Sequence, residues 1–99
     1  MVEFTLILKA LERASQRYSI LRSNGGRVRV RVDLIHDVIV SDRELSLEFK
    51  RLYGGIPSPG YIKYVLYELL KSLGVDLREA STGSVLVNLV RERMGVVGV

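Results

Sequence analysis

Apolar residues recur at intervals of three and four over the first part of the chain, and charged residues lie mainly between them. The apolar stripe consists of Phe4, Ile7, Leu11, Ala14, Tyr18 and Leu21. The pattern predicts an amphipathic helix over residues 3–22. The segment SNGG (23–26) is expected to end it, because glycine readily adopts the left-handed conformation found at helix ends.

Strict alternation replaces the helical spacing in the segment RVRVRV, residues 27–32. A period of two predicts a β-strand with Val28, Val30 and Val32 on its buried face. The opposite face holds three basic residues, Arg27, Arg29 and Arg31. These arginines form either a solvated face that discourages pairing of strand edges, or a ridge with a spacing of ~6.6 Å that contacts phosphates. The segment DLIHDVIV (33–40) fits a continued strand or a short helical turn.

Capping residues mark the start of two further helices. Ser41 and Glu44 have the spacing of a capping box and predict a helix to about residue 53. Ser58 suits an N-cap and Pro59 the first helical position, where a missing N–H costs nothing. The second of these helices is therefore expected to run from Pro59 to Leu73, with a glycine after it as the stop.

Two strands are predicted after these helices. VDLREA (75–80) and SVLVNLV (84–90) flank a turn around Thr82 and Gly83. The remaining residues, 91–99, have no clear period and are interpreted as a flexible tail of a single domain that spans residues 1–99.

The predicted order of helix, strand, helix, helix, strand, turn and strand resembles the winged helix-turn-helix superfamily. The resemblance covers roughly residues 3–90. It is carried by SDRELSLEFKRLYGGIPSPGYIKYVLYELLKSLGV followed by DLREASTGSVLVNLV. It implies an α+β fold with a small antiparallel sheet, in which the second and third helices form the helix-turn-helix and the last hairpin forms the wing. The first strand would pair beside that wing, away from the DNA groove. A plain α+β domain with another topology shares most of these signals.

The resemblance also implies that the third helix enters the major groove of duplex DNA. The residues expected to contact DNA are Ser58, Gly60, Lys63, Tyr64, Tyr67 and Lys71 of this helix, together with Arg27, Arg29 and Arg31 of the strand. The tyrosines could instead pack against other helices or a second subunit. Two features argue against tight binding: the exposed face of the helix lacks arginine, and the expected wing tip, STGS, is uncharged.

Composition narrows the classes of function. The chain is 47% hydrophobic and 26% charged, which is typical of a soluble globular protein, and no run is long enough to span a membrane. The net charge of +4 favours an acidic partner, nucleic acid first. The absence of cysteine excludes disulfides and thiol catalysis. A cytoplasmic location is expected, and the abundance of arginine with few amides hints at a thermophile.

No enzyme signature stands out. Asp33, His36 and Asp37 lie close together in the sequence, but their spacing matches no metal or catalytic motif, so a surface cluster is expected. Phosphate loops, nucleophile elbows and dinucleotide fingerprints are absent from the sequence. The chain is therefore expected to need no cofactor and to be no enzyme.

Surplus apolar positions suggest self-association. They are Leu6, Leu8 and Ile20 beside the first stripe, Leu86 and Val90 opposite Val85, Val87 and Leu89 in the last strand, and the segment GVVGV (95–99). A homodimer would bury them, and a monomer whose tail folds back onto the sheet would do the same. The leading hypothesis is a duplex DNA-binding transcriptional regulator or chromosome-associated factor. The alternative is a winged-helix protein–protein interaction module in a replication, transcription or viral assembly.

Overall fold

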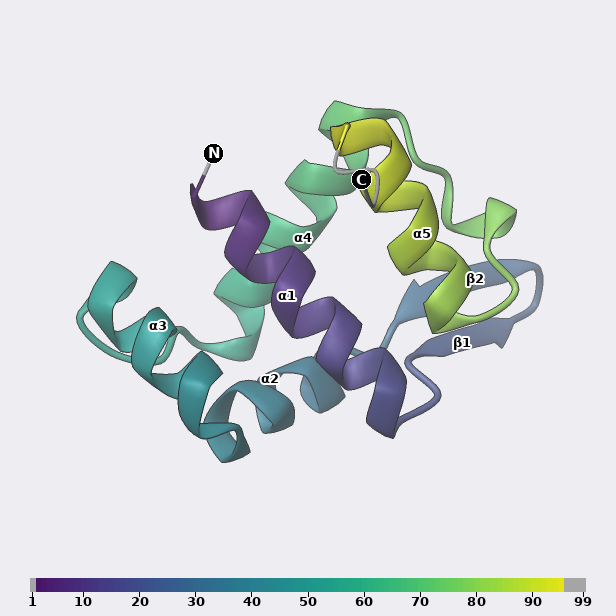
Figure 1. Ribbon diagram of the computed structural model, residues 1–99. Coiled ribbons are helices and arrows are strands. Elements are labelled where there is room, and N and C mark those ends of the chain that lie inside the picture. Colours follow the sequence, from purple (N-terminus) through teal and green to yellow (C-terminus); the bar gives the residue numbers. More distant parts are fainter. Residues whose placement is uncertain (1, 96–99) are drawn as a thin grey trace.

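Helix α1 (Val2–Arg17) runs through the middle of the molecule and contacts each of the other four α-helices (Figure 1). The computed structural model describes residues 2–95, which form a small α+β domain with five α-helices and a two-stranded antiparallel sheet. After α1 come β1 (Leu21–Asn24), β2 (Arg27–Val30), α2 (Val32–Ser41), α3 (Arg43–Tyr53), α4 (Pro59–Leu73), the 3₁₀ helix η1 (Leu77–Glu79) and α5 (Gly83–Met94). None of the helices within this range is long and apolar enough to cross a bilayer.

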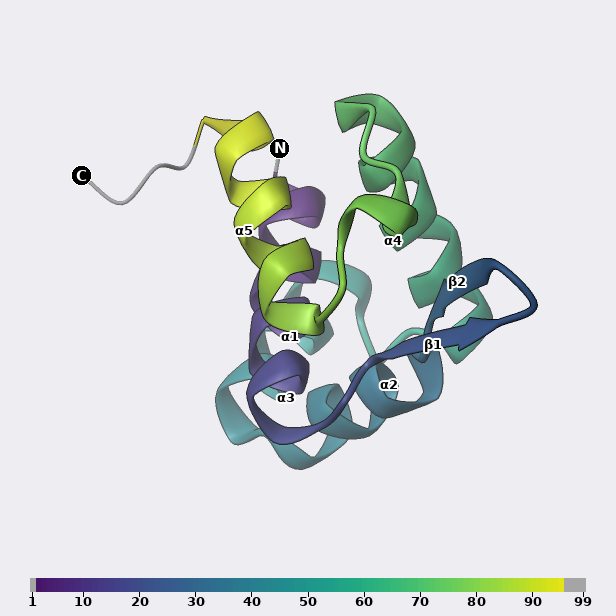
Figure 2. The same ribbon diagram turned by 90° about the vertical axis from the view of Figure 1, so that its right-hand side faces the viewer.

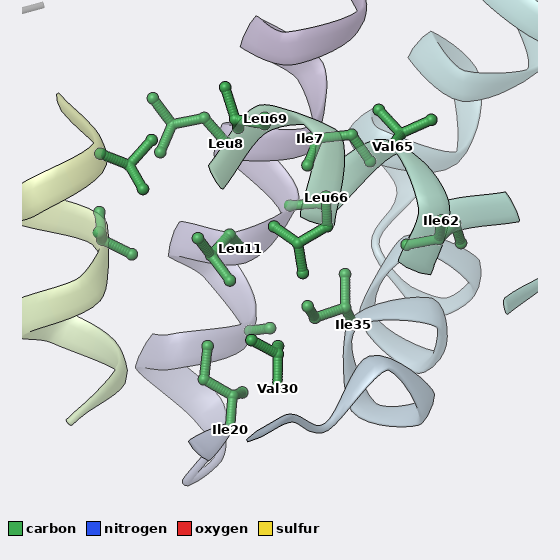
Figure 3. Close-up of a cluster of buried hydrophobic side chains, with 14 of the residues drawn as sticks. Ile7, Leu8, Leu11, Ile20, Val30, Ile35, Ile62, Val65, Leu66 and Leu69 are labelled. Atoms are coloured by element: carbon green, nitrogen blue, oxygen red, sulfur yellow. The ribbon is translucent and has the colours of Figure 1, made fainter. Parts of the chain in front are cut away.

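One hydrophobic core joins all of the α-helices to the base of the hairpin. Figure 3 shows Leu11 of α1, Ile35 of α2 and Leu66 of α4 pointing toward one another. Ile20 and Val30, on either side of the hairpin, are buried beside them. The core therefore fixes where the hairpin leaves the helical body.

Helix α4 confirms its prediction at both ends. The Ser58 hydroxyl accepts a hydrogen bond from the backbone N–H of Tyr61 at 3.3 Å, and Pro59 is the first helical residue. Gly74 ends the helix with a φ of 65°, which a residue with a side chain rarely adopts.

The capping box expected at Ser41 and Glu44 is wrong. Ser41 is the last residue of α2. The segment 33–40, for which the sequence left a strand or a helical turn open, lies within this helix. Asp42 is the N-cap of α3 and accepts from the backbone N–H of Leu45 at 3.0 Å. Glu44 instead pairs with basic residues of α1, so it attaches α3 to the central helix.

The segment predicted as the end of the first helix is a β-strand. Helix α1 ends at Arg17 rather than at residue 22, and Leu21–Asn24 pairs antiparallel with Arg27–Val30. The two-residue turn consists of Gly25 and Gly26, with φ of 59° and 80°, and such turns match the twist of a hairpin. SNGG therefore reverses the chain instead of stopping a helix. The arginine–valine strand ends at Val30 and pairs with residues before it, not with a later wing.

The final hairpin expected at 75–80 and 84–90 is also wrong. The first of these segments contains only the 3₁₀ helix η1, and the second lies within α5, which Thr82 caps by accepting from the backbone N–H of Val85 at 3.2 Å. Leu86, Val87 and Val90 recur at helical spacing and are buried, and α5 lies alongside α1 (Figures 1 and 2). Because these contacts bury the apolar side chains at helical spacing, the segment forms a helix although its apolar and β-branched residues also alternate as in a strand.

The apolar residues invoked for a homodimer are buried within the single chain. Leu6 and Leu8 are each 6% exposed, and Ile20 is fully buried. Leu86 and Val90 are also fully buried. These positions are buried by contacts within the chain, so they no longer support a dimer. The tail was expected to begin at residue 91, but residues 91–94 belong to α5. Residues 96–99, which make up most of the segment GVVGV, lie outside the described residues.

Candidate nucleic-acid interface

The hairpin gathers basic side chains on one face. Its register places Arg22 opposite Arg29 and Asn24 opposite Arg27, and directly opposed residues of an antiparallel pair share a face. All four side chains are exposed and border a common hollow. Val30 on the other face is buried in the core. The alternation of arginine and valine therefore has the orientation that the sequence predicts over residues 27–30.

This hairpin lies beside α4, and Figure 2 shows the two elements next to each other. A groove of about 780 Å³ runs between them and the segment around η1. Its polar and charged lining residues are Arg27, Arg29, Lys63, Tyr67, Lys71, Asp76 and Arg78. We call this hollow the basic groove.

Most cations of the basic groove have no acidic partner. Among residues 2–95, Arg27, Arg29, Lys63 and Lys71 form no ion pair. The one lining carboxylate, Asp76, is bound by Arg78 at 2.7 Å, and this contact lowers the pKa of Asp76 to about 2. Asp76 and Arg78 thus neutralise each other, and four uncompensated positive charges remain.

Several basic residues elsewhere in the domain form ion pairs between helices. Lys9 and Arg13 of α1 pair with acidic residues at the start of α3, including Asp42 at 2.8 Å from Arg13. Arg93 of α5 pairs with Glu79 at 3.0 Å. These cations join helices to one another, and carboxylates of the neighbouring helix face them.

Five of the nine residues expected to contact DNA line the groove: Arg27, Arg29, Lys63, Tyr67 and Lys71. Tyr67 makes a contact within the fold, in line with the packing alternative for the tyrosines. Its side chain is half-buried, and its hydroxyl accepts from the backbone N–H of Val30 at 3.4 Å. Tyr67 therefore links the hairpin to α4 and lines the groove beside the cations.

The other four residues lie outside the groove. Ser58 and Gly60 are in the first turn of α4, where Ser58 is occupied as the N-cap. Tyr64 is 61% exposed, with its ring centroid 6.1 Å from that of Tyr61. Arg31 is at the start of α2, where its guanidinium lies 3.7 Å from the carboxylate of Asp33.

Two further cations belong to this surface and were missed in the sequence. Arg22 joins the arginine face because Leu21–Asn24 is a strand, and the Gly-Gly pair at 25–26 is the signal that could have revealed it. Arg78 reaches the groove through η1, whose capping box of Asp76 and Glu79 was a readable signal.

Asp33, His36 and Asp37 do not form a metal site. Within residues 2–95, no group of three histidine or acidic side chains is arranged to hold a metal ion. Asp33 faces Arg31, and Asp37 accepts a hydrogen bond from the hydroxyl of Tyr18 at 2.9 Å. These acids contribute surface contacts around α2.

The chemistry available in the basic groove is that of anion binding. Guanidinium groups bind phosphate oxygens through two donors, and ammonium groups act as point charges. Residues of a β-ribbon and of a helix line the same hollow, so one extended polyanion could contact both elements. Comparison with family models, with curated proteins and with solved structures found no match to the chain.

Proposed function

We propose that this domain binds duplex DNA through the basic groove, as a transcriptional regulator or chromosome-associated factor. The observation that carries the proposal is the convergence of four unpaired cations from two elements, Arg27 and Arg29 from β2 and Lys63 and Lys71 from α4. Phosphate contacts of this kind supply most of the affinity of proteins for DNA. A net charge of +4 for the whole chain acts in the same direction.

The shape of the groove supports a duplex as the ligand. An α-helix borders one side of it and a two-stranded β-ribbon the other, and both elements fit the major groove of B-DNA. Arg27 and Arg29 are two residues apart on a strand, which separates them by ~6.6 Å along the backbone. This spacing suits contacts to neighbouring phosphates.

The proposal retains the winged helix-turn-helix resemblance in modified form. Helices α3 and α4 would correspond to the helix-turn-helix, with residues 54–58 as the connector. The hairpin β1–β2 would act as the wing, although it precedes these helices in the chain instead of following them.

Fluorescence anisotropy with a labelled duplex of about 20 base pairs tests the proposal over a range of about 50 to 200 mM salt. The groove variant carries three substitutions, Arg27→Gln, Arg29→Gln and Lys71→Gln. The control variant removes the same charge from the exposed face of α3 through Arg43→Gln, Lys50→Gln and Arg51→Gln. All six side chains are exposed, so neither variant disturbs the core.

The groove variant is expected to weaken binding more than about a hundredfold at the low-salt end, where counterion release is largest. The slope of log affinity against log salt should flatten by up to about 3, at about 0.9 per lost phosphate contact. The control variant should keep the slope and affinity of the original protein. Equal losses in both variants would mean that net charge alone drives binding, and an undiminished affinity in the groove variant would refute the proposed site.

A further inference from the structure

Helix α3 sorts its charges between two faces. Its acids Glu44 and Glu48 turn toward α1, where both pair with Lys9. Its bases are Arg43, Lys50 and Arg51, which are exposed and form no ion pair among residues 2–95. The acids of α3 are thus neutralised by α1, whereas its three bases keep an unpaired positive charge at the surface.

An apolar side chain lies in the middle of these cations. Leu47 is 48% exposed, and Arg43 and Arg51 are each one helical turn away from it on the same face. Lys50 is three residues from Leu47 and borders the same side. Leu47 therefore adds exposed apolar area among the three cations.

An apolar groove of about 620 Å³ adjoins this face, between α3 and the first turns of α1. Its walls include Val2, Leu6 and Leu52, of which Val2 is 70% and Leu52 42% exposed. Arg51 also lines the groove and connects it to the cations, and the remaining charged lining residues, Lys9 and Glu48, pair with each other at 2.8 Å. We call the combined area the α3 surface.

We propose that the α3 surface docks an acidic amphipathic helix of a partner protein. The apolar side chains of that helix would fill the groove beside Leu52, and its carboxylates would face Arg43, Lys50 and Arg51. Helix-in-groove recognition uses apolar anchors at intervals of three and four along the bound helix. This inference does not depend on DNA binding at the basic groove.

The chemistry of the α3 surface favours this occupant over two others. A second copy of the chain would bring its own α3 cations against those of the first, since Glu44 and Glu48 are already paired. A phosphate backbone would leave Leu47 and the apolar walls without an apolar partner. An acidic amphipathic helix satisfies both the charges and the apolar area.

Amide chemical shifts of the ¹⁵N-labelled protein test the inference with defined probes. The first probe is a helical peptide of about 16 residues, with leucine at every third or fourth position and glutamate on both flanks. The second peptide has glutamine in place of each glutamate, and the third has serine in place of each leucine. A DNA duplex and vesicles containing anionic lipid complete the set.

The acidic peptide is expected to shift resonances of α3 and of the first turns of α1. The glutamine peptide and the serine peptide should each bind the protein about tenfold or more weakly than the acidic peptide does. The acidic peptide should lose affinity to the same extent for the variant Leu47→Gln, Arg51→Gln. That variant should bind the duplex as the original protein does, which separates this test from that of the proposed function. Absence of binding by the acidic peptide at millimolar concentration, or its binding at the basic groove alone, would overturn the inference. Shifts of α3 by the duplex or binding of vesicles through α3 would assign the surface to DNA or to a membrane instead.

Discussion

Replacing Gly83 with alanine tests the contact through which α5 approaches α1. A Cβ atom at this position would lie 2.7 Å from Cγ1 of Ile20 and 3.0 Å from Cβ of Ser15. Ile20 is fully buried, so it cannot move aside as an exposed side chain would. Overpacking of this kind costs about 1–3 kcal/mol.

Gly60 provides a matched control, because it also lies in the first turn of a helix. A Cβ atom there would meet only the Ser58 hydroxyl, at 3.9 Å, which is an ordinary contact. Gly60→Ala is expected to raise the free energy of unfolding by up to about 1 kcal/mol, since alanine favours the helix and restricts the unfolded chain. Gly83→Ala gains the same term but also bears the steric cost, and we expect a net loss of about 1–2 kcal/mol.

Urea unfolding followed by circular dichroism measures both variants, and thermal unfolding provides an independent check. For a domain of this size, each kcal/mol corresponds to a shift in Tm of about 4–8 °C. The difference between the variants isolates the steric term. If Gly83→Ala is as stable as Gly60→Ala, then α5 does not approach α1 through this residue and the packing described here is wrong.

Two ionisable groups give further predictions. The pKa of Asp42 is lowered by the hydrogen bond from the Leu45 N–H and by Arg13, so its stabilisation is present above the unfolded pKa and declines as pH falls through the folded one. Asp42→Ala should cost about 1–2 kcal/mol at pH 7, and urea midpoints should show the difference shrinking below about pH 4; a constant difference would contradict the assignment. The pKa of Tyr53 is raised by burial and by its hydrogen bond to Glu3. Tyr53→Phe should cost about 1–2 kcal/mol at neutral pH and less above about pH 10, where the tyrosine of the unfolded chain ionises. Urea midpoints at both pH values measure the difference, and an equal cost at both would refute the contact.

A sequence prediction is accurate where the interactions that define an element lie within it or next to it in the chain. For α4, the N-cap Ser58, the first-turn Pro59 and the final Gly74 all lie in or next to the helix they define. Because these signals are local, no distant contact is needed to place the ends of the helix, and the prediction is confirmed at both ends. Asp42 shows the limit of the same approach, since Ser41 satisfies the capping rule in the sequence but belongs to α2 in the fold.

The hairpin was missed because two signals overlap. Tyr18 and Leu21 continue the helical spacing of α1, yet Tyr18 is exposed and Leu21 belongs to β1. A Gly-Gly pair serves equally to end a helix and to turn a hairpin, and the choice depends on whether its two flanks pair. Whether two strands pair depends on both of them, so the residue pattern on one side of the turn does not predict it.

The error in α5 has a similar cause. Val85, Val87 and Leu89 alternate like a strand, but Leu86 and Val90 fit the helix that the fold selects. The deciding contact is tertiary, namely the close approach of Gly83 to Ile20. The basic groove also depends on tertiary structure. The sequence indicated cations on β2 and on α4, but only the folding of the hairpin against α4 brings them together.

The hairpin differs from the rest of the domain in how little of it reaches the core. Its described residues between Arg22 and Arg27 are all exposed, and an isolated two-stranded hairpin is marginally stable in water. Its backbone amides should therefore exchange hydrogen with solvent through local opening. The buried amides of α1 should exchange only when the whole domain unfolds. The arginine face can consequently rearrange on a ligand without loosening the core. Slowed exchange confined to residues 21–30 is then the signature of an occupied groove.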